Sequence, residues 1–124
     1  MPRSKSVLVV DDDSSMRTSI GRLLRAHGLG VLLFDSVEAL FGHVDFSNAI
    51  CLVIDINLGH RSGIDLRRHL MKEGVTTPVI YVTGNDSPTH RSIAVESGCV
   101  AYLTKPFTAQ SLIESIERAR SELG

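Results

Sequence analysis

Charged residues follow three apolar runs in this chain, each at the point where the run ends. Asp11, Asp12 and Asp13 follow the first run, Asp55 follows the second, and Lys105 follows the third. Short apolar runs of this kind predict buried strands. The carboxyl ends of parallel strands lie along one edge of a sheet, where ligands bind. We therefore expect these acids and the lysine to converge on one pocket.

The chemistry of such a pocket follows from its charges. Two carboxylates ~5 Å apart repel by about 3 kcal/mol at an effective dielectric of 20, so a cation or a proton must offset the repulsion. Oxygen ligands favour Mg²⁺, Mn²⁺ or Ca²⁺ over zinc or copper. A carboxylate is also a nucleophile that can form an aspartyl phosphate, and phosphoryl transfer depends mostly on positioning and charge neutralisation. The pattern favours a divalent cation and a phosphoryl group, with Lys105 supplying part of the neutralisation.

A fourth apolar run, 79–82, ends in Thr83 and Gly84. The Thr83 hydroxyl is suited to donate to a phosphoryl oxygen. Gly84 has no side chain and therefore lets the backbone approach a ligand closely. We expect both residues at the same edge of the sheet as the acids.

Alternating strand-like and helix-like stretches provide the frame that positions these residues. Strands are predicted over about 6–10, 31–34, 50–54, 79–82 and 100–104, and helices over about 15–26, 37–44, 64–73, 88–97 and 109–122. Ser36 and Thr108 are candidate N-caps, and Pro88 suits a first helical turn. The glycines placed to end helices are Gly28, Gly74 and Gly98. A long loop is expected after the third strand, through Gly63.

Five β-α units in succession predict an α/β fold. Their crossovers are right-handed and put helices on both faces of a parallel sheet. The flavodoxin-like, doubly wound (βα)5 arrangement with strand order 2-1-3-4-5 places strands one and three side by side. Asp11, Asp12 and Asp55 would then be neighbours.

The bulk composition excludes several classes of protein. The 124 residues fit a single domain, and 43% hydrophobic with 22% charged residues is typical of a globular chain. A net charge of -1 argues against direct nucleic-acid binding by this segment. No apolar run approaches the ~20 residues of a membrane span. Cys51 and Cys99 match no zinc or redox spacing, so we expect reduced thiols in a cytoplasmic protein without membrane contact.

Together these motifs resemble the receiver domain of two-component response regulators. The resemblance rests on Val9-Val10-Asp11-Asp12, Asp55, Thr83-Gly84 and Lys105-Pro106-Phe107, each closing a predicted strand in this order and spacing. It covers nearly the whole chain. The stretches 82–84 and 102–107 most resemble the nitrogen-fixation regulator branch, whose members commonly carry a DNA-binding helix-turn-helix.

The resemblance implies an acceptor and a metal site. Asp55 would receive the phosphoryl group from a histidine kinase or a phosphotransfer protein. Asp12 would bind Mg²⁺ (or Mn²⁺) directly, and Asp11 directly or through water, beside the Asp55 carboxylate. Asn57 would give the metal its backbone carbonyl.

It also implies a group of residues that sense the phosphoryl group. Lys105 would contact it, and Thr83 would report its presence. Tyr102 lies at the position of the switch aromatic and would turn inward as Thr83 moves. Pro106 would follow a cis peptide bond with Lys105, the isomer seen almost only before proline.

The chain departs from the family pattern at a few positions. Gly59 stands where many receivers have proline, which predicts a more flexible loop through His60 and puts the Asn57 carbonyl in doubt as a metal ligand. Asp13 is a third consecutive acid and is expected to face solvent or to cap the first helix. Asn57 and Asn85 occupy positions that shape phosphoryl lifetime, and neither can act as a base toward water.

The leading hypothesis is a phosphorylation-controlled signalling switch. Phosphorylation of Asp55 would change the surface formed by helix four, strand five and helix five, and would promote dimerisation. Such a protein catalyses only its own phosphorylation and dephosphorylation. The output would be control of transcription through a domain outside these 124 residues, with the chain as the N-terminal part of a longer regulator or as a stand-alone receiver.

Two alternatives stay open. Asp11 and Asp13 offer the D-x-D pattern of a dehalogenase-type aspartyl-phosphate phosphatase, although that class needs further acids where Pro106 and Phe107 stand. A phosphorylation-independent interaction module with the receiver fold is the other, and the full set of acceptor residues argues against it. A flavodoxin is disfavoured because the three consecutive acids would repel the phosphate of a flavin.

Overall fold

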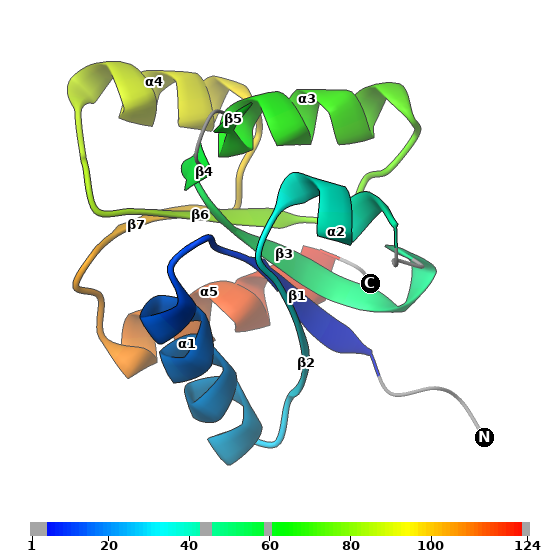
Figure 1. Ribbon diagram of the computed structural model, residues 1–124, viewed down its shortest axis with the longest axis vertical. Helices are drawn as coiled ribbons and strands as arrows, with labels where there is room; N and C mark the ends of the chain where they lie inside the picture. Colours follow the sequence, from blue (N-terminus) through cyan, green and yellow to red (C-terminus); the bar gives the residue numbers. More distant parts are fainter. Residues whose placement is uncertain (1–4, 43–45, 59–60, 123–124) are drawn as a thin grey trace.

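The computed structural model describes residues 5–42, 46–58 and 61–122 (Figure 1). Its centre is a five-stranded parallel sheet in the order β2-β1-β3-β6-β7. The strands are β1 (Ser6–Val10), β2 (Gly30–Phe34), β3 (Ala49–Asp55), β6 (Val79–Thr83) and β7 (Ala101–Thr104). Counted along the chain within this sheet the order is 2-1-3-4-5, which confirms the predicted topology.

Helices cover both faces of the sheet, as the doubly wound arrangement requires. They are α1 (Ser14–Ala26), α2 (Val37–Phe41), α3 (Gly63–Lys72), α4 (Pro88–Glu96) and α5 (Ala109–Glu122), with a 3₁₀ turn η1 (Phe46–Asn48) before β3. Figure 1 shows α1 and α5 on one face and α2, α3 and α4 on the other. Each face has its own apolar core. Leu24, Leu112 and Ile116 belong to one core, while Leu40, Leu70 and Tyr81 belong to the other.

The helix boundaries follow the predicted capping residues. The Ser36 hydroxyl accepts from the Ala39 N–H at 3.1 Å, and the Thr108 hydroxyl accepts from the Ser111 N–H at 3.0 Å. Pro88 lies in the first turn of α4. Gly28, Gly74 and Gly98 adopt positive φ angles just past α1, α3 and α4, a conformation that costs little only for glycine.

Two details of the prediction were wrong. Helix α2 ends at Phe41, because Gly42 forms its C-cap and glycine propagates a helix poorly. The predicted end at Val44 lies outside the described residues. The predicted loop after β3 contains a small antiparallel sheet, in which β4 (Asn57–Leu58) pairs with β5 (Arg61–Ser62). Strands of two residues are too short to show any alternation, so no pattern of residues predicted them.

The remaining loop expectations concern Gly59 and His60, which also lie outside the described residues. Within the described ranges, no helix has both the length and the apolarity needed to cross a bilayer.

Candidate functional site

The carboxyl ends of β1 and β3 bring three acids together. These strands are neighbours in register, with Val10 opposite Ile54, so Asp11 and Asp55 meet at one edge of the sheet. Asp11, Asp12 and Asp55 each place a carboxylate oxygen within 4.8 Å of the others. Asp11 and Asp55 are buried, whereas Asp12 is exposed. The predicted convergence of these three acids is therefore present in the fold.

Lys105 joins two of the acids from the end of β7. Its ammonium donates to Oδ2 of Asp11 at 3.1 Å and to Oδ2 of Asp55 at 3.0 Å, and its side chain is only 15% exposed. Burial alone would lower the pKa of Lys105. The hydrogen bonds and negative charges of Asp55 and Asp11 outweigh burial, so the pKa is raised and the lysine stays charged.

The two buried acids also share a pattern of backbone contacts. Oδ1 of Asp11 accepts from the Asp13 N–H, and Oδ1 of Asp55 accepts from the Asn57 N–H, both at 2.9 Å. Burial is the largest influence on Asp11 and raises the pKa of its carboxyl. The Asp55 charge adds to this effect, while the Asp13 N–H and Lys105 oppose it. Three carboxylates share the one Lys105 ammonium here, so the cluster has more negative charge than this lysine neutralises.

The donor set fits a hard divalent cation. Three carboxylates supply only oxygen ligands, and Asp12 is exposed and free to turn toward an ion. Asn57 begins β4, and its N–H donates to Oδ1 of Asp55. Asp13 caps α1 through its own carboxylate, which accepts from the N–H groups of Ser15 and Met16.

Thr83 and Gly84 lie beside Lys105. Thr83 ends β6, is fully buried, and accepts from the Asn85 N–H through its hydroxyl at 3.0 Å. Its carbonyl accepts from the Lys105 N–H at 2.7 Å. A methyl group placed on Gly84 would lie 3.9 Å from Cδ of Lys105, so this glycine borders the lysine side chain without crowding it.

Tyr102 is not brought into the acid cluster. It lies in β7 and is half-buried, and its hydroxyl donates to Oδ1 of Asp86 at 2.9 Å. The Arg91 guanidinium lies over its ring, 4.9 Å from the centroid. The peptide bond between Lys105 and Pro106 is cis, in agreement with the expectation.

Two residues next to the acids escaped the sequence analysis. Arg17, in the first turns of α1, donates to the backbone carbonyl of Asp11 at 2.8 Å. Gly63, which the sequence marked only as a loop end, begins α3 directly against β3. A Cβ on Gly63 would lie 2.5 Å from the Asp55 carbonyl oxygen and 2.6 Å from Cγ2 of Ile54. Of these two residues, only Arg17 could have been suspected from the sequence, because it is an arginine early in the helix that follows the acids.

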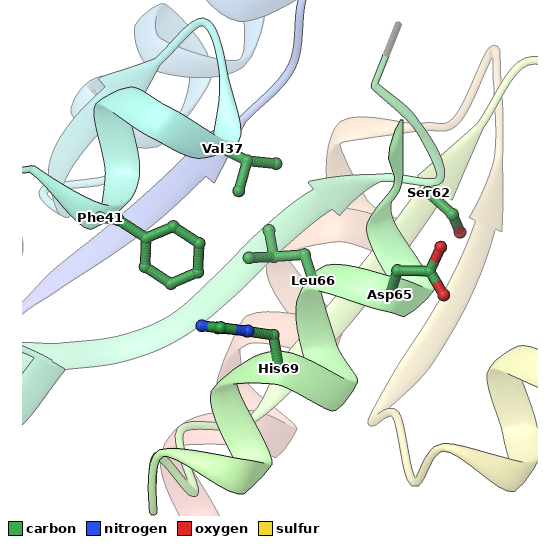
Figure 2. A pocket seen from close by; sticks show the side chains of 6 residues that line it. All are labelled: Val37, Phe41, Ser62, Asp65, Leu66 and His69. Atoms are coloured by element: carbon green, nitrogen blue, oxygen red, sulfur yellow. The ribbon is translucent and has the colours of Figure 1, made fainter. Parts of the chain in front are cut away.

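A separate cavity of about 220 Å³ lies between α2 and α3 (Figure 2). It is lined by Val37, Phe41, Ser62, Asp65, Leu66 and His69. The rings of Phe41 and His69 meet edge to face, with centroids 4.9 Å apart. None of the acids of the cluster lines this cavity, so we assign it no part in the site chemistry.

The two glycines of the site predict opposite responses to alanine. Gly63→Ala must displace the Asp55 backbone and should cost about 1–3 kcal/mol of the free energy of unfolding, as overpacking does. Gly84→Ala meets only an ordinary van der Waals contact and should cost less than about 0.5 kcal/mol. Urea unfolding of both variants beside the wild type measures the free energy of unfolding. An equally small loss in both would show that the Asp55 backbone moves aside at little cost.

Comparison with known proteins identifies the family. The model of the response regulator receiver domain matches residues 7–117. The transcriptional regulatory protein FixJ of Rhizobium meliloti is 33% identical over 119 residues, which cover 95% of this chain and 58% of that protein. Nodulation protein W of Bradyrhizobium diazoefficiens is 34% identical over 113 residues, covering 91% of this chain and 50% of that protein. The chain thus spans about half the length of these relatives.

Solved structures agree with the sequence relatives. The crystal structure of FixJ-N superposes with a TM-score of 0.87 at 31% identity and covers 99% of this chain and 98% of that one. The response regulator StyR gives a TM-score of 0.89 at 31% identity, over 97% of this chain and 61% of that one. A family model that matches most of the chain, together with these relatives, places it among the response regulator receiver domains, in the FixJ-type branch.

Proposed function

We propose that this chain is a phosphoryl-accepting receiver in which Asp55 takes a phosphoryl group from a phosphohistidine on a histidine kinase or a phosphotransfer protein. The observation that carries the proposal is the Lys105 ammonium shared between Asp11 and Asp55. This ammonium places a fixed positive charge next to the nucleophilic carboxylate of Asp55. Charge neutralisation and positioning are what phosphoryl transfer needs most.

The transfer forms one bond to phosphorus and breaks one. One carboxylate oxygen of Asp55 attacks phosphorus, and the bond from phosphorus to the donor's histidine nitrogen breaks. The electron pair stays on that nitrogen, which takes up a proton. Lys105 then contacts the phosphoryl oxygens, and the Thr83 hydroxyl donates a hydrogen bond to one of them. Gly84 leaves room beside the lysine side chain.

Asp11, Asp12 and Asp55 would hold Mg²⁺ or Mn²⁺, together with the Asn57 carbonyl. When bound, the ion neutralises charge on the phosphoryl oxygens. The support for this assignment is the proximity of the three carboxylates, which share the one Lys105 ammonium. The chain would act as a catalyst only for its own phosphorylation and dephosphorylation.

A small apolar pocket beside the site suits the protein that brings the phosphoryl group. It has a volume of about 210 Å³ and is lined by Met16, Ser19, Ile20, Leu23, Pro106 and Phe107. Pro106 and Phe107 directly follow Lys105, and Met16 and Leu23 project from the helix that follows the acids. A donor that docks one apolar side chain here would place its phosphohistidine near Asp55.

In our proposal, the output function of the regulator belongs to a domain outside this chain. The relatives are about twice as long, and two of them carry the name of a transcriptional regulatory protein. We propose that the chain controls transcription in the cytoplasm through a further domain of the regulator, and that phosphorylation promotes its dimerisation. A net charge of -1 is consistent with leaving DNA contact to that domain.

Incubation with acetyl phosphate and Mg²⁺, followed by intact mass measurement, tests the acceptor. The wild type should gain the mass of one phosphoryl group, because Asp55 is placed beside Lys105. Asp55→Asn lacks the nucleophilic oxygen and should gain nothing, and EDTA should abolish the gain in the wild type. An unmodified but folded wild type would instead favour the phosphorylation-independent interaction module.

Mg²⁺ should raise the melting temperature, because the ion relieves repulsion that only the folded site contains. An ion at 100 times its Kd stabilises by about 2.7 kcal/mol. Asp12→Asn should lose most of this gain, whereas Asp65→Asn, an exposed acid outside the cluster, should retain it. Thermal unfolding with and without Mg²⁺ at matched ionic strength measures the effect. An equal gain in both variants would place the ion elsewhere.

The docking pocket predicts a donor-specific defect. Leu23→Asp puts a charge into an apolar contact, which should slow transfer from a phosphorylated phosphotransfer domain by about tenfold or more. Modification by acetyl phosphate needs no docking and should be unchanged. Leu32→Asp, at an exposed leucine of β2, is the matched control. If Leu23→Asp slowed both donors alike, the pocket would have no role in partner recognition.

A further inference from the structure

A polar cluster on the surface near the site consists of Asp86, Arg91 and Tyr102. We call it the Asp86 cluster. Oδ2 of Asp86 accepts from Nη2 of Arg91 at 2.9 Å, and Oδ1 accepts from the Tyr102 hydroxyl at 2.9 Å. Arg91 also lies over the Tyr102 ring, 4.9 Å from its centroid. Each member therefore contacts the other two.

The Asp86 cluster links three parts of the chain. Asp86 lies in the segment between β6 and α4, Arg91 in α4, and Tyr102 in β7. Among the residues of α4 only Ala94 is buried, so apolar packing holds this helix weakly. At its other end the Tyr81 hydroxyl pairs with Ser97 at 3.0 Å. Polar contacts at its two ends thus contribute much of what fixes α4 against the sheet.

Backbone hydrogen bonds connect the Asp86 cluster to the phosphoryl-contacting residues. The Asn85 N–H, next to Asp86, donates to the Thr83 hydroxyl. The Lys105 N–H, three residues after Tyr102, donates to the Thr83 carbonyl. The Thr83 hydroxyl keeps its own proton for donation, but if its oxygen moves toward a phosphoryl group on Asp55, the Asn85 N–H must follow it or lose this bond. Asp86 then moves with the segment, unless its contacts with Arg91 and Tyr102 resist.

We propose that Asp86 and Arg91 are positioning residues that hold the segment 84–87 and the Tyr102 ring in the resting arrangement, and so slow phosphoryl uptake by Asp55. The proposal rests on the proposed function of Asp55, and it names contacts that set the rate at which Asp55 takes up the phosphoryl group. Coupling between two sites is reciprocal. If phosphorylation has to loosen the Asp86 cluster, loosening the cluster makes phosphorylation easier.

Two variants test this while leaving Asp86 in place before α4. Arg91→Gln removes the ion pair and the cation over the ring, and Tyr102→Phe removes only the hydroxyl contact. With acetyl phosphate and Mg²⁺, each should take up the phosphoryl group about two- to fivefold faster than the wild type, the range by which one exposed ion pair shifts an equilibrium. The double variant should be no faster than the faster single variant, because the contacts act as a unit.

The control is Arg68→Gln, which breaks an exposed pair with Asp65 on α3 at 3.8 Å and should leave the rate unchanged. A second readout separates positioning from general loosening. Without any phosphodonor, the amide resonances of Gly84 and Asn85 should shift in Arg91→Gln and Tyr102→Phe, while the urea midpoint stays near that of the wild type.

The outcomes keep the two proposals apart. A wild type modified at Asp55, with both variants at its rate and with unshifted amides, would overturn the positioning role and leave the acceptor function standing. Rates that rise equally in Arg68→Gln would also overturn it. A wild type that takes up no phosphoryl group would overturn the acceptor function, and the positioning role with it.

Discussion

Repulsion among carboxylates at the ends of β1 and β3 is the constraint on which the site depends. Charges ~5 Å apart repel by about 3 kcal/mol at an effective dielectric of 20, and Asp11, Asp12 and Asp55 lie within this range of one another. Lys105 bonds two of them, which leaves Asp12 to solvent. The resting site is therefore incompletely neutralised, and a divalent cation bound there, as we propose, would stabilise it more than it would a fully paired cluster.

The surrounding structure is arranged to let one lysine reach both acids. β6 lies between β3 and β7, so the Lys105 side chain must pass the end of β6 to reach Asp55 and Asp11. Gly84 follows that end, and a Cβ added to it would lie 3.9 Å from Cδ of Lys105. On the other side, Gly63 allows α3 to start against the Asp55 backbone. The two glycines thus differ: Gly63 permits a close backbone contact that a side chain would block, whereas Gly84 borders the lysine at a place where a methyl group would also fit.

The sequence predicted the parts of this arrangement that depend on strand ends. Asp11, Asp55, Thr83 and Lys105 each close an apolar run, and parallel topology alone brings such positions together. It could not predict contacts that depend on tertiary distance. Asp86 and Tyr102 are sixteen residues apart and follow no periodic pattern, and the closeness of Gly63 to Asp55 appears only when α3 is packed. The end of α2 was missed because a glycine at position 42 competed with an otherwise helical pattern.

The same contacts explain why a change at Asp55 would travel toward α4 and not into the core. Oδ1 of Asp55 is held by the Asn57 N–H and Oδ2 by Lys105, so a group added to either oxygen must alter one existing bond. The neighbouring strands β1, β3 and β6 are almost fully buried and close-packed, and such interiors resist small displacements. The segment after Thr83 is held by polar contacts near the surface, which exchange with water at small net cost. If Asp55 is phosphorylated, as we propose, we expect the resulting strain to be relieved mainly through Thr83 and Asp86, because the least apolar packing is lost in that direction.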